Sequence, residues 1–219
     1  MSDLTLIIGN KNYSSWSLRP WIFMKTAGIE FAEKRVALGT DQTKTQLEPY
    51  FSDHKVPVLV DGDFIVWDSL AILEYITGKF PDCGGWPVDP EARAVARSVS
   101  AEMHSSFFEL RENLPMNCRK KFTSFSPSSG AQKDIDRIKA VWRYCKQYFP
   151  NKGPWLFGDF SIADAMFAPV CFRFYSYGVN LDGSEKEYVK SMLSLLHIIE
   201  WGKAAKLEKE VLEYAEVRQ

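Results

Sequence analysis

A break rich in proline and glycine divides this chain into two parts with different hydrophobic periodicity. Residues 81–90 read PDCGGWPVDP, a composition that interrupts both helices and strands. Before the break, short strand-like and helix-like segments alternate; after it, apolar residues recur at helical spacing almost to the C-terminus. We therefore expect an α/β domain over residues 1–80, a linker over 81–90 and an all-helical domain over 91–219.

The first part predicts an α/β sandwich of about thioredoxin size, with the element order β-α-β-α-β-β-α. Its most specific signal is a hairpin, in which two β-branched runs flank the turn at Asp61-Gly62. Gly28 stands where a C-terminal cap would end the first helix. The expected ranges are strands at 4–8, 30–37, 56–60 and 64–66, and helices at 16–26, 39–48 and 69–80.

The second part predicts a bundle of helices. A stripe of apolar residues at four- and three-residue steps indicates one long helix with a buried face. Ser161 and Asp164 have the spacing of a capping box ahead of a later helix, and we assign them a structural role. The stripe consists of Val95, Val99, Met103, Phe107 and Leu110. The remaining helices are expected at 131–149, from about 161, at 186–196 and at 198–217.

Composition and charge exclude several classes of function. The 219 residues are 46% hydrophobic and include 27 basic and 28 acidic side chains, so no basic surface for nucleic acid is expected. The start of the chain lacks a signal-peptide pattern, and no run approaches the ~20 apolar residues of a membrane span. Four cysteines and three histidines are scattered without metal-ligand spacing. We therefore expect reduced thiols, no metal and a cytoplasmic protein.

Three short motifs indicate a binding site. The run Tyr13-Ser14-Ser15-Trp16-Ser17 opens the first helix, where unpaired N–H groups stabilise an anion such as a thiolate. Val56-Pro57 opens a strand; a cis bond would present the valine backbone to an extended peptide, although spacing alone favours an ordinary trans proline. Asp68-Ser69 precedes another helix and would hold an ammonium and a carboxylate. Each motif also has a purely structural interpretation, as a helix cap or an edge proline, and the residues alone leave both open.

The order and spacing of these motifs resemble the cytosolic glutathione transferases, in the serine-type branch near the zeta and theta classes. The resemblance covers nearly the whole chain, from a thioredoxin-like domain to a helical domain with a capping box. It implies glutathione as co-substrate, a small electrophile as second substrate, a homodimer and a role in detoxification. It implies no metal, no nucleic acid and no membrane partner.

The resemblance also assigns roles to single residues. Ser14 is the first candidate for the hydroxyl that hydrogen-bonds the glutathione sulfur, Ser15 the second and Tyr13 the third; which serine contacts the thiolate stays open. The other implied glutathione contacts are Val56 and Pro57 for the cysteinyl backbone, Asp68 and Ser69 for the γ-glutamyl end, and Lys55 and Gln42 for the glycyl end.

Two substitutions depart from the family pattern. Trp16 stands where zeta-type enzymes have a cysteine, so we expect it to pack over the ligand or in the core, and chemistry that needs that thiol is in doubt. Asp68 replaces the usual glutamate and is one methylene shorter, so its ammonium contact would be longer or bridged by water.

The second substrate's pocket is indicated less specifically. His104, Phe108 and Arg111 would share one face of the long helix. This face would point either toward the active-site cleft, with Met116 and Asn117 following in the next turn, or into solvent. Arg111 would suit an anionic substrate. The aromatic residues expected in the core are Phe172, Phe174, Tyr175 and Tyr177.

Three functions fit these observations. The first is a glutathione transferase that activates the thiolate with a serine hydroxyl. The second is a zeta-like, glutathione-dependent cis–trans isomerase of an unsaturated dicarboxylic acid, of the maleylacetoacetate type. The third is a non-catalytic docking module with the same fold.

Overall fold

The computed structural model describes residues 4–122, 124–149 and 153–217. The ends of the two expected domains, residues 1–3 and 218–219, lie outside this range. The first part contains, in chain order, β1 (Leu4–Ile8), α1 (Ser15–Thr26), β2 (Ala32–Arg35), α2 (Thr43–Leu47), β3 (Val58–Asp61), β4 (Phe64–Val66) and α3 (Ser69–Lys79). The second contains η1 (Pro81–Cys83), α4 (Pro90–Ser105), α5 (Phe108–Asn113), α6 (Ser129–Tyr148), α7 (Ile162–Ser176), α8 (Gly183–Ser194), α9 (Leu196–Leu207) and η2 (Glu213–Ala215).

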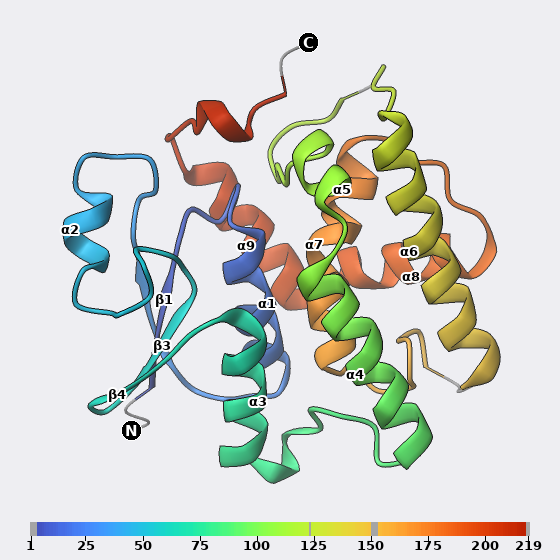
Figure 1. The fold of residues 1–219 in the computed structure, drawn as a ribbon, viewed down its shortest axis with the longest axis horizontal. Helices are drawn as coiled ribbons and strands as arrows, with labels where there is room; N and C mark the ends of the chain where they lie inside the picture. Colours follow the sequence, from blue (N-terminus) through green and yellow to red (C-terminus); the bar gives the residue numbers. More distant parts are fainter. Residues whose placement is uncertain (1–3, 123, 150–152, 218–219) are drawn as a thin grey trace.

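The first part is a thioredoxin-like sheet covered by helices. Its strand order is β2-β1-β3-β4; β1 runs parallel to β2, and β3 runs antiparallel to both of its neighbours. β1 is apolar on both faces: Leu6 joins the main core and Ile7 joins a smaller core with Leu47 of α2. α1 and α3 pack together between the sheet and the second part (Figure 1). The predicted fold class and the predicted hairpin are confirmed.

The second part is helical and packs around α7. This helix contacts both α1 and α4, and nearly every residue in it is buried, which explains its apolar sequence on all sides. Its start is held by the predicted capping box, in which the Asp164 carboxylate accepts hydrogen bonds from Ser161 N and Leu156 N, both at 3.0 Å. One hydrophobic core therefore runs through both parts.

The long helix expected after residue 91 is broken at Phe107. This residue has a left-handed φ of 62°, which ends α4 and starts α5 in a new direction. Phe107 and Leu110 stay buried, whereas Phe108 is 71% exposed. The prediction that Phe108 lines the cleft is therefore wrong, because its side chain faces solvent, as the alternative of a solvated face has it. The three residues also do not share one helix, since His104 lies in α4 and Phe108 and Arg111 lie in α5.

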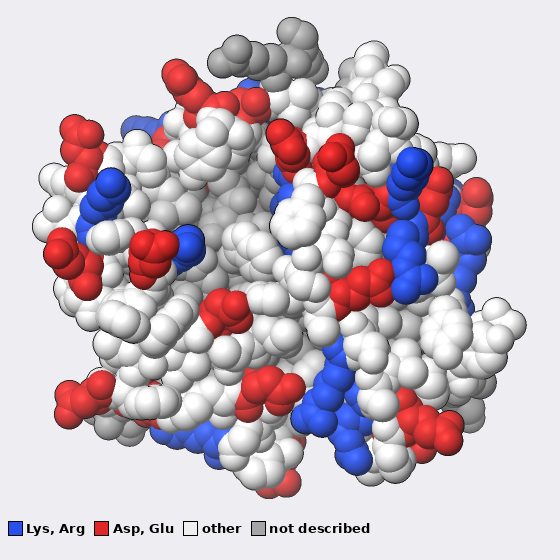
Figure 2. Space-filling model, viewed as in Figure 1, with Lys and Arg blue, Asp and Glu red and all other residues white. Residues whose placement is uncertain are grey.

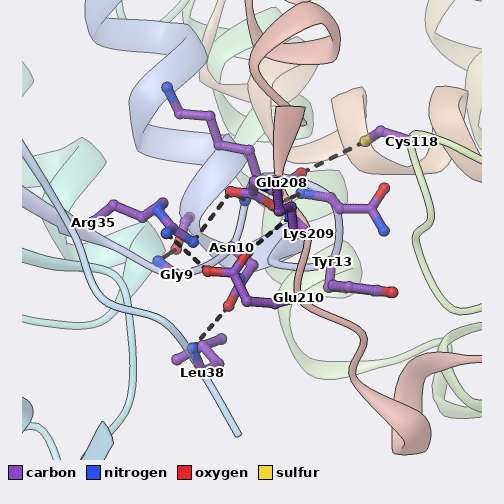
Figure 3. A network of polar contacts seen from close by, with 12 residues as sticks. Gly9, Asn10, Tyr13, Arg35, Leu38, Cys118, Glu208, Lys209 and Glu210 are labelled. Carbon is purple, nitrogen blue, oxygen red and sulfur yellow. Dashed lines mark hydrogen bonds and ion pairs between the residues drawn. The ribbon is translucent and has the colours of Figure 1, made fainter. Parts of the chain in front are cut away.

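The last helix is also shorter than expected. α9 ends at Leu207, and residues 208–217 run back across the molecule as an extended segment with one short turn, η2 (Figure 1). We call residues 208–217 the C-terminal segment. The Glu208 carboxylate accepts hydrogen bonds from Lys11 N at 2.7 Å and Asn12 N at 3.0 Å, so the segment is attached to the loop after β1 (Figure 3). The prediction of helix up to residue 217 is wrong because these contacts pull the chain away from the helix axis.

Candidate active site

A cavity of about 760 Å³ opens between the two parts. Figure 2 shows the surface hollowed between the side that carries α2 and the side that carries α4 and α5. The first part contributes the start of α1, the loop before β3 and the start of α3. The second part contributes α4, α5 and α7, and the C-terminal segment lines the cavity through Leu212, Tyr214 and Ala215. Two helix N-termini therefore line the same open cavity.

Ser14 is the N-cap of α1. Its hydroxyl accepts a hydrogen bond from Ser17 N at 3.3 Å and donates one to Ser17 Oγ at 2.7 Å. Ser17 Oγ also accepts from Gly9 N at 3.1 Å. The capping role considered for this serine is thus observed, while the side chain still borders the cavity.

Ser15 is the first residue of α1 and has a different environment. Its Oγ accepts a hydrogen bond from Nη2 of Arg173 on α7, at 3.3 Å. Tyr13, the third candidate, donates its hydroxyl hydrogen to Glu216 in the C-terminal segment. Burial, and then this bond to a carboxylate, raise the pKa of Tyr13.

Val56 and Pro57 reach the cavity just before β3. The bond between them is cis, as the family resemblance implied. A Cβ on Gly9 would lie 2.6 Å from Leu38 Cδ1 and 3.1 Å from Val56 Cγ2, so glycine there allows the close approach of these loops. Lys55 also lines the cavity, but its Nζ pairs with the exposed Asp53 at 2.7 Å. Gln42 precedes α2 and does not line the cavity.

Asp68 and Ser69 form the start of α3. One carboxylate oxygen of Asp68 accepts from Leu70 N at 3.0 Å and the other lies 2.9 Å from His104 Nε2. The hydrogen bond with His104 lowers the pKa of Asp68. Ser69 Oγ is buried and has no hydrogen-bond partner among the described residues. This hydroxyl is free for a ligand at the helix N-terminus.

Trp16 lies within a cluster of arginines at the junction of the two parts. Its ring centroid is 4.1 Å from the Arg19 guanidinium carbon and 4.5 Å from that of Arg111, both cation–π distances. The ring of His104 meets its edge at 5.4 Å. Trp16 therefore packs against the second part and lines the cavity, and its expected place, over the ligand or in the core, stays a prediction.

The guanidinium groups of Arg19, Arg111 and Arg173 lack part of their hydrogen-bond partners among the described residues. Burial lowers the pKa of Arg111 to about 10 and that of Arg173 to about 9, and it lowers the pKa of Arg19 as well. Each carries at least one buried Nη without a hydrogen-bond partner in the described part of the chain. Arg19 and Arg173 were not among the residues predicted from the sequence. The available signal was an arginine within an otherwise apolar helix, since arginine is almost never fully buried unless it is paired.

Most of the predicted candidates meet at the cavity, although their roles stay predictions. Met116 lines it and Asn117 does not. Phe172, Phe174 and Tyr177 are buried as expected, whereas Tyr175 is 52% exposed and was predicted wrongly. The candidates that line the cavity are Tyr13, Ser14, Ser15, Trp16, Lys55, Val56, Pro57, Asp68, Ser69, His104, Arg111 and Met116.

The part of the chain that carries the three motifs is similar to a known protein family. Residues 13–78 match the family described as glutathione S-transferase, N-terminal domain. This stretch, about a third of the chain, is similar to that family. It includes the serine turn, Val56-Pro57 and Asp68-Ser69, so the family resemblance drawn from these motifs is confirmed.

Relatives and solved structures extend the similarity beyond the first part. A probable maleylacetoacetate isomerase of Caenorhabditis elegans is 28% identical over 76% of this chain and 77% of its own length. A dichloromethane dehalogenase of Methylorubrum extorquens is 41% identical, but the match spans only 29% of this chain and 23% of that protein. A glutathione transferase homolog from Burkholderia GL BGR1, solved with bound glutathione, has a TM-score of 0.67 at 23% identity and covers 93% of this chain and 97% of its own. The chain therefore has the glutathione transferase fold.

Two further observations concern metal binding and membrane spans. Among the described residues, no cluster of histidine, cysteine, aspartate or glutamate is arranged to hold a metal ion. No helix in residues 4–122, 124–149 and 153–217 is long and apolar enough to cross a membrane.

Proposed function

We propose that this chain binds glutathione in the cavity and transfers its thiolate to a small electrophile. The observation that carries the proposal is that the N-termini of α1 and α3 face the same cavity, with Val56 and Pro57 in its lining. Helix N-termini favour anions, and glutathione offers a γ-glutamyl carboxylate for one and a thiolate for the other. The proposal is supported by the family match over residues 13–78.

The contacts follow the chemistry of the ligand. The free Ser69 hydroxyl and the start of α3 suit the γ-glutamyl carboxylate, and the Asp68 carboxylate suits the neighbouring ammonium. The Val56 backbone suits the cysteinyl peptide group, as an added strand would. The Lys55 ammonium, after release from Asp53, suits the glycyl carboxylate. We propose no role for Gln42, which lies away from the cavity.

Thiolate formation needs a modest energy. A thiol with a pKa of ~8.5 is only a few per cent ionised at neutral pH. Lowering that pKa by two units requires ~2.7 kcal/mol. A hydrogen bond from a serine hydroxyl to the charged sulfur supplies about 1.5–3 kcal/mol, and the helix N-terminus up to about 1 kcal/mol. The thiol proton leaves to solvent; the sulfur lone pair then forms the bond to carbon, and the leaving group departs with its bonding electrons.

A second function is favoured by Arg111. One Nη of this arginine is buried without a hydrogen-bond partner among the described residues, and the side chain lines the cavity. A carboxylate on the second substrate would accept a hydrogen bond from this Nη and pair with the guanidinium charge. Addition of the thiolate to a conjugated double bond, rotation and elimination would then give a cis–trans isomerase that returns glutathione unchanged. The isomerase name of the C. elegans relative supports this alternative.

The test compares two substrate classes in the presence of glutathione: an activated aryl halide and an unsaturated dicarboxylic acid. Thioether formation from the first above the uncatalysed rate would support the transferase, and isomerisation of the second without loss of glutathione would support the isomerase. Ser69→Ala should raise KM for glutathione in either case, whereas Ser128→Ala, at the exposed N-cap of α6, should not. Turnover of neither substrate would overturn the proposed function.

Assembly is tested separately. We propose a homodimer, which light scattering would show as twice the chain mass; a monomer at working concentration would contradict it.

A further inference from the structure

The two serines that face the cavity are not equivalent. The Ser14 hydrogen is used within the cap, because Ser14 donates to Ser17 Oγ at 2.7 Å while its oxygen accepts from Ser17 N. A ligand that took the Ser14 hydrogen would have to break this arrangement at the start of α1. Ser14 is therefore engaged before any ligand arrives.

Ser15 is prepared for the opposite role. Its oxygen already accepts from Arg173 Nη2 at 3.3 Å, and no bond among the described residues takes its hydrogen. Donation from a cation draws electron density from the hydroxyl oxygen, which makes that hydroxyl a stronger donor because hydrogen bonds in a chain reinforce one another. The Ser15 hydrogen is thus both available and polarised.

Arg173 is fixed in place behind Ser15. Its Nε donates to Leu114 O at 2.8 Å, it is 3% exposed, and its Nη1 is buried without a partner within the described residues. A buried cation without a nearby anion is unfavourable. An anion bound next to Ser15 would be separated from the Arg173 guanidinium only by the Ser15 hydroxyl, and its negative charge would reduce this unfavourable energy.

We propose that Ser15, rather than Ser14, donates the hydrogen bond to the glutathione thiolate, and that Arg173 is a positioning residue that orients and polarises the Ser15 hydroxyl. Ser14 serves as the cap of α1. This inference rests on the proposed function, because the anion is the sulfur of bound glutathione. No covalent bond to Ser15 or Arg173 is made or broken, and the thiol proton goes to solvent.

The test is the ionisation of glutathione on the protein, followed by the ultraviolet absorbance of the thiolate as the pH is raised. Ser15→Ala should lower the ionisation constant of the bound thiol by about tenfold or more, the effect of losing one hydrogen bond to a charged acceptor. Ser14→Ala should leave it nearly unchanged. Ser176→Ala is the matched control, since it removes a buried serine hydroxyl that bonds Asn117 O and does not line the cavity.

A double-variant cycle tests the part played by Arg173. Arg173→Lys keeps the charge but loses the planar fork that reaches both Leu114 O and Ser15 Oγ. It should lower the ionisation constant in the wild-type background and have a much smaller effect in the Ser15→Ala background, because it acts through that hydroxyl. A merely structural role would instead give equal effects in both backgrounds.

The outcomes are distinguishable from failure of the proposed function. If glutathione binds and Ser14→Ala raises the thiol pKa while Ser15→Ala does not, the assignment to Ser15 is overturned. If Arg173→Lys has equal effects in both backgrounds, the role of Arg173 is overturned. If no variant, including wild type, binds glutathione, the proposed function itself fails.

Discussion

Glu208 should be far more important for stability than its neighbour Glu210, although both carboxylates approach Arg35. The Glu208 carboxylate accepts hydrogen bonds from two backbone N–H groups, those of Lys11 at 2.7 Å and Asn12 at 3.0 Å, and its side chain is 7% exposed. Glu210 makes one ion pair with Arg35 at 2.8 Å, at 28% exposure, and among the described residues it accepts a backbone hydrogen bond only from its exposed neighbour, Lys209 N, at 3.1 Å. Removal of the first carboxylate leaves two backbone donors of the active-site loop without their partners.

The magnitude follows from these contacts. Hydrogen bonds to a charged group are worth about 1.5–3 kcal/mol each, so Glu208→Ala should lower the free energy of unfolding by about 3 kcal/mol or more. A surface ion pair contributes about 0.2–1 kcal/mol, so Glu210→Ala should cost less than about 1 kcal/mol. Glu208→Ala should also release the C-terminal segment, which lines the cavity through Leu212 and Tyr214.

Urea unfolding measures both free energies, and amide hydrogen exchange reports on Lys11 and Asn12 directly. We expect faster exchange of these two amides in Glu208→Ala and no change in Glu210→Ala. Equal destabilisation by the two substitutions, or unchanged exchange in Glu208→Ala, would show that the Glu208 carboxylate does not hold this loop.

Three further predictions concern the site. Ser14→Ala removes the N-cap of α1 and should lower the free energy of unfolding by about 1 kcal/mol, which thermal unfolding would show. Tyr13→Phe should loosen the C-terminal segment, because the Tyr13 hydroxyl bonds Glu216 and Arg119; proteolysis after residue 207 should become faster while the bound thiol ionises as before. The lowered pKa of Asp68 means that ionised Asp68 stabilises the fold above the usual aspartate pKa of ~3.9, and that this contribution is lost as the pH falls through the lowered value. The difference in Tm between wild type and Asp68→Asn should therefore be largest near neutral pH and shrink in acid.

Local signals predicted much of the first part of the chain, and the start of α7 in the second. β1 matches the expected residues 4–8, and the Asp61-Gly62 turn joins β3 to β4. Asp164 and Ser161 form their capping box. These features depend on short-range chemistry: alternation, turn residues and caps act within a few positions of the chain.

The breaks in the second part could not be predicted in this way. Phe107 keeps the helical spacing of buried residues although its own φ is left-handed, so the hydrophobic period continues across the break. The C-terminal segment leaves the helix because Glu208 bonds a loop 196 residues earlier in the chain, at Asn12. Arg19 and Arg173 come together only through the packing of α1 on α7. Periodicity carries no information about such contacts.

The most direct test of the central claim is a thermal melt with and without glutathione. A ligand that binds only the folded state stabilises it by about 2.7 kcal/mol at a hundredfold excess over its Kd. We predict a rise in Tm for wild type, for Ser14→Ala and for Ser15→Ala, because Ser14 caps α1 and Ser15 acts only on the thiol, while Ser69 and Val56 hold the rest of the ligand. Ser69→Ala should show a smaller rise. The absence of any rise in wild type at millimolar glutathione would contradict the claim and favour a docking module with this fold.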